Sequence, residues 1–97
     1  MIAKYGFETT IVDGGRVLTT PNIQGILRAI RCIFETLSTT FVLAIDDNNG
    51  VPVYKSETET GALVNQLALP VKGIYTITFS DVSKNEDFEL KLEVEEG

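Results

Sequence analysis

Hydrophobic and polar residues alternate along much of this chain, most clearly near its end. From Phe88 to Glu95, four apolar residues alternate with four charged residues without a break. Successive side chains of a strand point to opposite faces, so this segment predicts a strand with one buried face and one charged, solvated face. Half-buried strands of this kind are typical of antiparallel sheets, which mostly build sandwiches and barrels.

The same period of two predicts further strands in residues 4–12, 16–20, 39–45, 51–56, 63–69 and 74–80. Turn-forming residues separate them, notably Asp13-Gly14-Gly15 and Asp46–Gly50, and Pro70 is expected to end the strand before it. The sequence therefore predicts an all-β fold. We expect a single antiparallel β-sandwich of about eight strands, of jelly-roll or immunoglobulin-like form.

The length of 97 residues suits one domain, so residues 1–97 are expected to share a single core. Residues 1–12 form either an N-terminal strand or an arm that contacts neighbouring subunits. The apolar positions of the predicted strands give the expected core: Phe41, Leu43, Ile45, Ile77, Phe79, Phe88, Leu90, Leu92 and Val94.

Residues 22–38 allow two interpretations. Their apolar positions fall at helical spacing, Asn22 is a good N-cap, and Arg31 and Glu35 have the spacing of a helical ion pair. Against a helix, Gly25 lies in the first turn and the segment contains four isoleucines, which are β-branched. The hydrophobic pattern alone slightly favours a helix.

Charge is concentrated at the end of the chain. The net charge is −6, and residues 81–97 hold seven acids and two lysines, which leaves −1 for residues 1–80. An acidic closing strand repels phosphate, so direct nucleic-acid binding is not expected. It is either a solvated face that prevents edge-to-edge aggregation or a docking surface for a basic partner. No apolar run is long enough to span a membrane, and no signal peptide is recognised at the N-terminus.

Candidate chemistry is sparse. The chain contains no histidine, so the usual general base is missing and we predict no catalytic residues and no enzyme activity. The single Cys32 lies in an apolar stretch and is expected to be a buried thiol. Residues 46–50 are rich in oxygen ligands, but their spacing departs from a calcium loop and favours a hairpin turn. No metal and no cofactor is predicted.

Four residues are candidates for a partner interface. Arg28 and Arg31 are basic residues inside an apolar run, whose stems either lie across an exposed face or pair with acids of a neighbouring subunit. In a regular strand they would point to opposite faces. Tyr5 and Phe7, near the N-terminus, belong either to the core or to an arm docked on a neighbour.

The segment Thr19–Ile30, with Thr20, Ile23, Gly25, Leu27, Ala29 and Ile30 in a T-x-x-I-x-G-x-[LI]-x-A-I pattern, precedes the polar run Ser38-Thr39-Thr40. These motifs and the tail Phe88–Glu95 resemble small virion accessory proteins of tailed bacteriophages over residues 17–95. The chain departs from them in having Phe41 where an acid commonly follows the threonines, and in a short middle loop. The resemblance favours a long strand in residues 22–38.

What the resemblance implies is a structural virion protein: a small β-sandwich subunit that decorates the capsid or belongs to the head–tail junction or the tail. It would bind other virion proteins, form a homo-oligomer, and be found in the virion after assembly in the host cytoplasm. The alternative function is a ligand-binding or adhesive β-sandwich that recognises carbohydrate or a cell surface. An exposed pair of Tyr54 and Tyr75 would favour that alternative.

Overall fold

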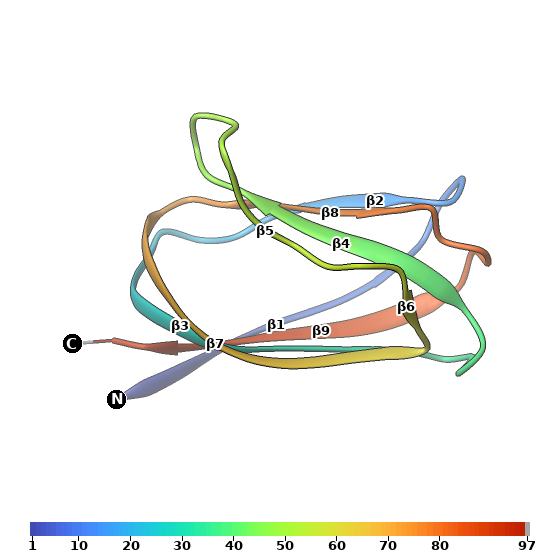
Figure 1. The fold of residues 1–97 in the computed structure, drawn as a ribbon, viewed down its shortest axis with the longest axis horizontal. Coiled ribbons are helices and arrows are strands. Elements are labelled where there is room, and N and C mark those ends of the chain that lie inside the picture. Colours follow the sequence, from blue (N-terminus) through green and yellow to red (C-terminus); the bar gives the residue numbers. More distant parts are fainter. Residues whose placement is uncertain (97) are drawn as a thin grey trace.

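A computed structural model describes residues 1–96 of the chain, which form two antiparallel sheets packed face to face (Figure 1). No helix in this part of the chain is long and apolar enough to cross a membrane. The all-β sandwich predicted from the alternating pattern is confirmed. Its strands are β1 (Ile2–Thr10), β2 (Arg16–Thr19), β3 (Ile23–Phe34), β4 (Thr40–Asp46), β5 (Pro52–Lys55), β6 (Glu59–Thr60), β7 (Ala62–Gly73), β8 (Thr76–Ser80) and β9 (Asp87–Glu95).

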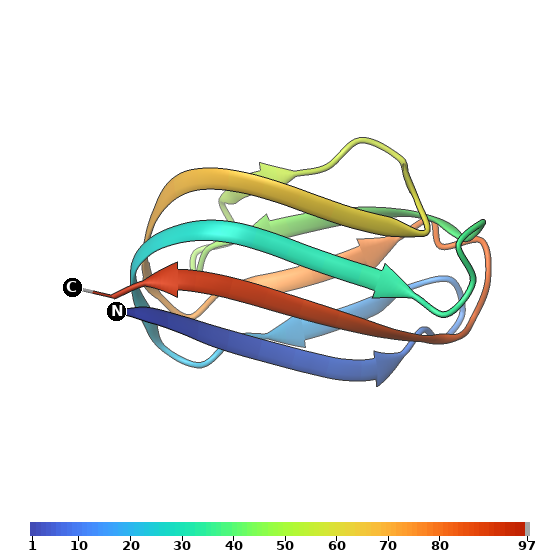
Figure 2. The ribbon, with the colours of Figure 1, turned by 90° about the horizontal axis from the view of Figure 1, so that it is seen from below.

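The strand order identifies the sandwich as a jelly roll rather than an immunoglobulin-like fold. One sheet has the order β1-β9-β3-β7 and the other β2-β8-β4-β5, with the two-residue β6 beside β4 (Figure 2). The first strands thus pair with the last in nested fashion: β1 with β9, β2 with β8, β3 with β7 and β4 with β5. The chain is one long hairpin rolled up into two sheets, which is the jelly-roll arrangement.

The space between the sheets is filled by the residues that the alternation placed inside. All nine predicted core residues are buried. Four phenylalanines from both sheets pack at one end of this core, with ring centroids 4.4 Å apart for Phe79 and Phe88 and 4.6 Å apart for Phe34 and Phe41. Aromatic rings at such distances add to the burial of their area, so this cluster is expected to be a main source of stability.

Within residues 22–38, β3 occupies Ile23–Phe34 as the long strand that the resemblance indicated, and a turn follows over residues 35–38. The helix that the pattern alone favoured is wrong. The residues of β3 that face the core change parity at a bulge between Leu27 and Ala29. Leu27 and Ile30, three positions apart, therefore both point inward and imitate helical spacing. Gly25 has φ +143°, and an added Cβ would lie 2.1 Å from the carbonyl oxygen of Glu95, so only glycine fits there.

Two local features complete the frame. Asp13 and Gly14 have positive φ and Val12 pairs with Gly15, which confirms the tight turn predicted between β1 and β2. Pro70 does not end its strand as predicted, because β7 continues to Gly73. β7 is an end strand of its sheet, where proline is tolerated since its missing N–H can face away from the neighbouring strand.

Candidate interaction surface

The outer face of the sheet β1-β9-β3-β7 is charged and internally paired. Arg28 donates from Nε and Nη2 to Glu95 Oε2 at 2.9 and 2.5 Å, and Arg31 donates from Nε to Glu93 at 3.1 Å. Both arginines thus meet acids of β9 on one face, whereas a regular strand would have separated them. The prediction of opposite faces is wrong because the bulge at Arg28 inserts one extra residue between them.

The two arginines therefore pair with acids of their own chain. Arg28 and Glu95 are both partly exposed, and so is Arg31, so these ion pairs stabilise the fold only modestly. Their main effect is to neutralise part of the acidic closing strand. Lys91 does the same for Glu89, at 3.3 Å on the same strand.

Residues 2–10 are a regular edge strand rather than a detached arm. Tyr5 and Phe7 point toward the core and pack against it, but both remain half-buried because no further strand within residues 1–96 covers that side. Tyr5 Oη donates to Glu96 Oε2 at 2.6 Å, and this hydrogen bond is the main cause that raises the pKa of Tyr5. The interaction ties the start of the chain to its end.

The backbone of β1 has one satisfied side and one open side. The amides of Ile11 and Glu96 donate to the carbonyls of Glu86 and Met1, which places the odd-numbered residues of β1 in hydrogen-bonded pairs with β9. In an antiparallel ladder the intervening residues direct their N–H and C=O groups away from the partner. The open groups therefore belong to Ile2, Lys4, Gly6, Glu8 and Thr10.

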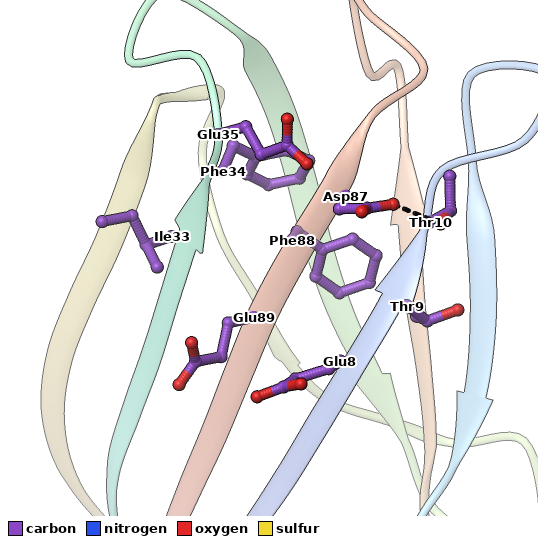
Figure 3. A pocket seen from close by; sticks show the side chains of 9 residues that line it. All are labelled: Glu8, Thr9, Thr10, Ile33, Phe34, Glu35, Asp87, Phe88 and Glu89. Atoms are coloured by element: carbon purple, nitrogen blue, oxygen red, sulfur yellow. Dashed lines mark hydrogen bonds between the residues drawn. The ribbon is translucent and has the colours of Figure 1, made fainter.

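An acidic depression lies where β1, β9 and β3 meet near the end of the sandwich. It has a volume of about 580 Å³ and is lined in part by Glu8, Glu35, Asp87 and Glu89. Figure 3 shows the carboxylates of Glu8 and Glu89 side by side on neighbouring strands, as their direct pairing in the ladder requires. Like charges directly opposite each other repel, so this position would gain from a nearby cation.

No cation of the chain meets that need at Glu8. Within residues 1–96, neither Lys4 nor Glu8 takes part in an ion pair, whereas Glu89 has Lys91 and Asp87 accepts a hydrogen bond from Thr10. No group of acids, cysteines or histidines in the same range has the geometry of a metal site. The facing carboxylates of Glu8 and Glu89 therefore suit a positively charged group.

One acid, Glu86, is buried, which the sequence did not predict. Glu86 is only 8% exposed. Its carboxylate accepts hydrogen bonds from the Thr39 hydroxyl at 2.5 Å and from the hydroxyl and amide of Thr36 at 2.7 and 3.3 Å. The Thr39 bond, helped by those of Thr36 and by Lys84, lowers the pKa of Glu86 despite its burial. Glu86 thereby joins two loops at one end of the sandwich.

The oxygen-rich loop at residues 46–50 and the thiol of Cys32 both have structural roles. Asp47 Oδ1 accepts the amides of Asn49 and Val51, both at 2.9 Å, as in the hairpin turn that the sequence favoured over a calcium loop. Burial raises the pKa of the Cys32 thiol to about 12, so it stays protonated and unreactive.

The two tyrosines that would have favoured a carbohydrate site are not an exposed pair. Tyr75 is buried, and its hydroxyl accepts the amide of Lys72 at 2.9 Å. The hydroxyl of Tyr54 accepts a hydrogen bond from Asn65 at 3.0 Å. Both phenol hydroxyls are therefore engaged in hydrogen bonds within the chain.

No family model matches the sequence, and no curated protein matches it. Among solved structures, those of the Gt and Gx strains of infectious bursal disease virus are similar, with TM-scores of 0.42 and 0.43 and 13% identity. The matches cover 97% and 100% of this chain but 32% of each viral chain, so the chain spans about a third of their length. A likeness this loose does not establish a shared function.

Proposed function

We propose that this chain is a structural subunit of a virus particle, and that it acts by binding other virion proteins rather than by catalysis. The jelly roll is an architecture of viral capsid domains, although it also occurs in lectins and cupins. The resemblance of the segments Thr19–Ile30 and Phe88–Glu95 to accessory proteins of tailed phages supports the same role. We further propose that the particle is a tailed phage, with the subunit on its capsid, neck or tail.

The observation that carries the proposal is the exposed outer face and the open end strands of the sheet β1-β9-β3-β7. The sheet β1-β9-β3-β7 has a charged outer face and ends in two long strands, β1 and β7. Among residues 1–96, each of these two strands pairs on one side only. Soluble proteins that act alone usually cover, shorten or bend such edges. A subunit that joins an assembly uses them, because each new contact adds buried area and shifts the equilibrium toward the bound state.

The alternative of a carbohydrate-binding module has less support. Sugar-binding sites usually offer exposed aromatic rings, whereas Tyr75 is buried and Tyr54 is hydrogen-bonded to Asn65. The chain has no tryptophan. The proposed role therefore remains that of a structural protein, present in many copies and localised in the virion.

The test is to band particles from lysed cultures of the source on a density gradient and to quantify this chain by mass spectrometry. The proposal expects it to co-band with a major capsid or tail protein at a fixed ratio that survives a second gradient in higher salt. Recovery of the chain only in the soluble fraction would overturn the proposal. A mixing control, in which isotope-labelled chain is added after lysis, separates incorporated copies from adsorbed ones.

A further inference from the structure

We propose that β1 is a self-association edge, on which a second copy of the chain adds its own β1 in antiparallel orientation with Gly6 opposite Gly6. The inference rests on the geometry of β1 and would stand even if the virion role failed. Because the partner is a second copy of the same chain, the contact has two-fold symmetry. The two four-stranded sheets would join into one continuous sheet of eight strands.

Strand β1 presents an unprotected edge. It is nine residues long and pairs with β9 along its whole length without a register shift, and it contains no proline. Figure 2 shows it along the margin of the molecule, with no other strand of the described residues beyond it. The open N–H and C=O groups of its even-numbered residues would form about ten backbone hydrogen bonds with a second copy in the proposed register.

Charge complementarity between the two copies of β1 selects the register. With Gly6 opposite Gly6, Lys4 of each copy lies opposite Glu8 of the other, and all nine residues of β1 are paired. If the second copy is shifted by two residues along the ladder, Lys4 no longer lies opposite Glu8. Larger shifts place Lys4 opposite Lys4, or Glu8 opposite Glu8, and shorten the ladder.

The charges of Lys4 and Glu8 are not neutralised by residues 1–96 of the free molecule. Glu8 faces the like charge of Glu89 across the ladder, and within residues 1–96 neither Glu8 nor Lys4 has an ion-pair partner. In the proposed dimer, Lys4 of the second copy enters beside Glu8 at the rim of the acidic depression. Each copy thus supplies the cation that the other lacks.

The inner face of β1 fits the same register. Tyr5 of one copy would lie opposite Phe7 of the other, and both side chains are half-buried in the free molecule. Aromatic pairs directly across an antiparallel ladder attract each other. At the centre, an added Cβ on Gly6 would meet no atom within 4 Å of its own chain, so the outer face of the sheet is uncovered at this position.

The decisive experiment is a charge swap followed by sedimentation velocity and light scattering. The wild-type chain should dimerise within the range of about 1 µM to about 1 mM. Lys4→Glu and Glu8→Lys should each weaken the dimer by about tenfold or more, because each creates two like-charge contacts. An equimolar mixture of the two variants should form a heterodimer at near wild-type affinity, because the charges then match again. Lys72→Glu on β7, which makes the same change on the other end strand, should leave dimerisation unchanged.

Several results would overturn the proposal: a wild-type chain that stays monomeric throughout this range, single variants that dimerise like wild type, or a mixture that stays monomeric. Thermal unfolding of each variant at low concentration verifies that its fold is intact.

Gly6→Cys gives a second measurement that does not depend on charge. Cα atoms of hydrogen-bonded pairs lie about 5.5 Å apart, within disulfide range, and Cys32 is buried. Mild oxidation should link this variant into a covalent dimer faster than Lys72→Cys, and equal rates would contradict the proposed register.

Discussion

Replacing Phe79 with alanine is the most direct test of how the two sheets are held together. Phe79 lies in β8 and is 1% exposed. Its ring centroid lies 4.4 Å from that of Phe88 in the opposite sheet, 6.0 Å from that of Phe34 and 6.1 Å from that of Phe41. Truncation removes one ring from a cluster that bridges both sheets.

The size of the effect follows from that environment. Truncation of a buried phenylalanine to alanine costs about 3–5 kcal/mol, and the cost is largest where the surroundings cannot collapse. Three neighbouring rings drawn from both sheets make collapse difficult, so we expect a loss of about 4–5 kcal/mol. A domain of this size has a free energy of unfolding of about 5–15 kcal/mol. At about 4–8 °C per kcal/mol, the melting temperature should fall by at least about 16 °C.

The assay is urea unfolding followed by circular dichroism, with Phe7→Ala as the matched control. Both variants lose the same atoms, but Phe7 is half-buried on the end strand β1 and should cost about 1–2 kcal/mol. The comparison is made at low protein concentration, where any association through β1 is absent. If Phe79→Ala lost no more stability than Phe7→Ala, the aromatic cluster would not be the main contact between the sheets.

Three further outcomes follow from the structure. Gly25→Ala should lose about 2–4 kcal/mol in urea unfolding, because its Cβ would meet the Glu95 carbonyl, whereas Gly6→Ala, with open space, should be neutral or slightly stabilising. Glu86→Gln should be less stable than wild type at pH 7. The pKa of Glu86 is lowered in the folded state, so its contribution to the free energy of unfolding is present above the unfolded-state pKa of about 4.3. That contribution disappears as the pH falls through the folded-state pKa, so the stability curves of the variant and the wild type should converge in acid. Parallel curves would contradict this role of Glu86. Arg31→Ala should cost less than about 1 kcal/mol, and even less in high salt, since its ion pair is exposed.

The sequence predicted the strands wherever alternation ran without interruption. Phe88–Glu95 and residues 39–45 and 74–80 were placed correctly with their buried faces, because a period of two reports directly which side of a sheet is covered. Residues 22–38 were ambiguous for a physical reason. A bulge changes the parity of the inward positions, and Leu27 and Ile30 then have the spacing of a helix face.

The candidate surface was harder to predict, because it depends on which strands become neighbours. That Arg28 and Arg31 meet acids of β9 follows from the bulge and from the place of β9 beside β3. The buried carboxylate of Glu86 is bound by Thr39 and Thr36, which lie 47 and 50 residues before it in the sequence. No local pattern reveals such a distant contact. Tyr5 and Phe7 were recognised as candidates, but only the strand order shows that β1 is an end strand with an open side.

The measurement that tests the central proposal most directly is a cryo-electron microscopy reconstruction of the banded particles. We expect density for a two-sheet sandwich of about 37 × 25 × 21 Å, repeated at symmetry-equivalent positions on the particle and in contact with a neighbouring virion protein. Particles whose reconstructed capsid, neck and tail are fully explained by other proteins would contradict it.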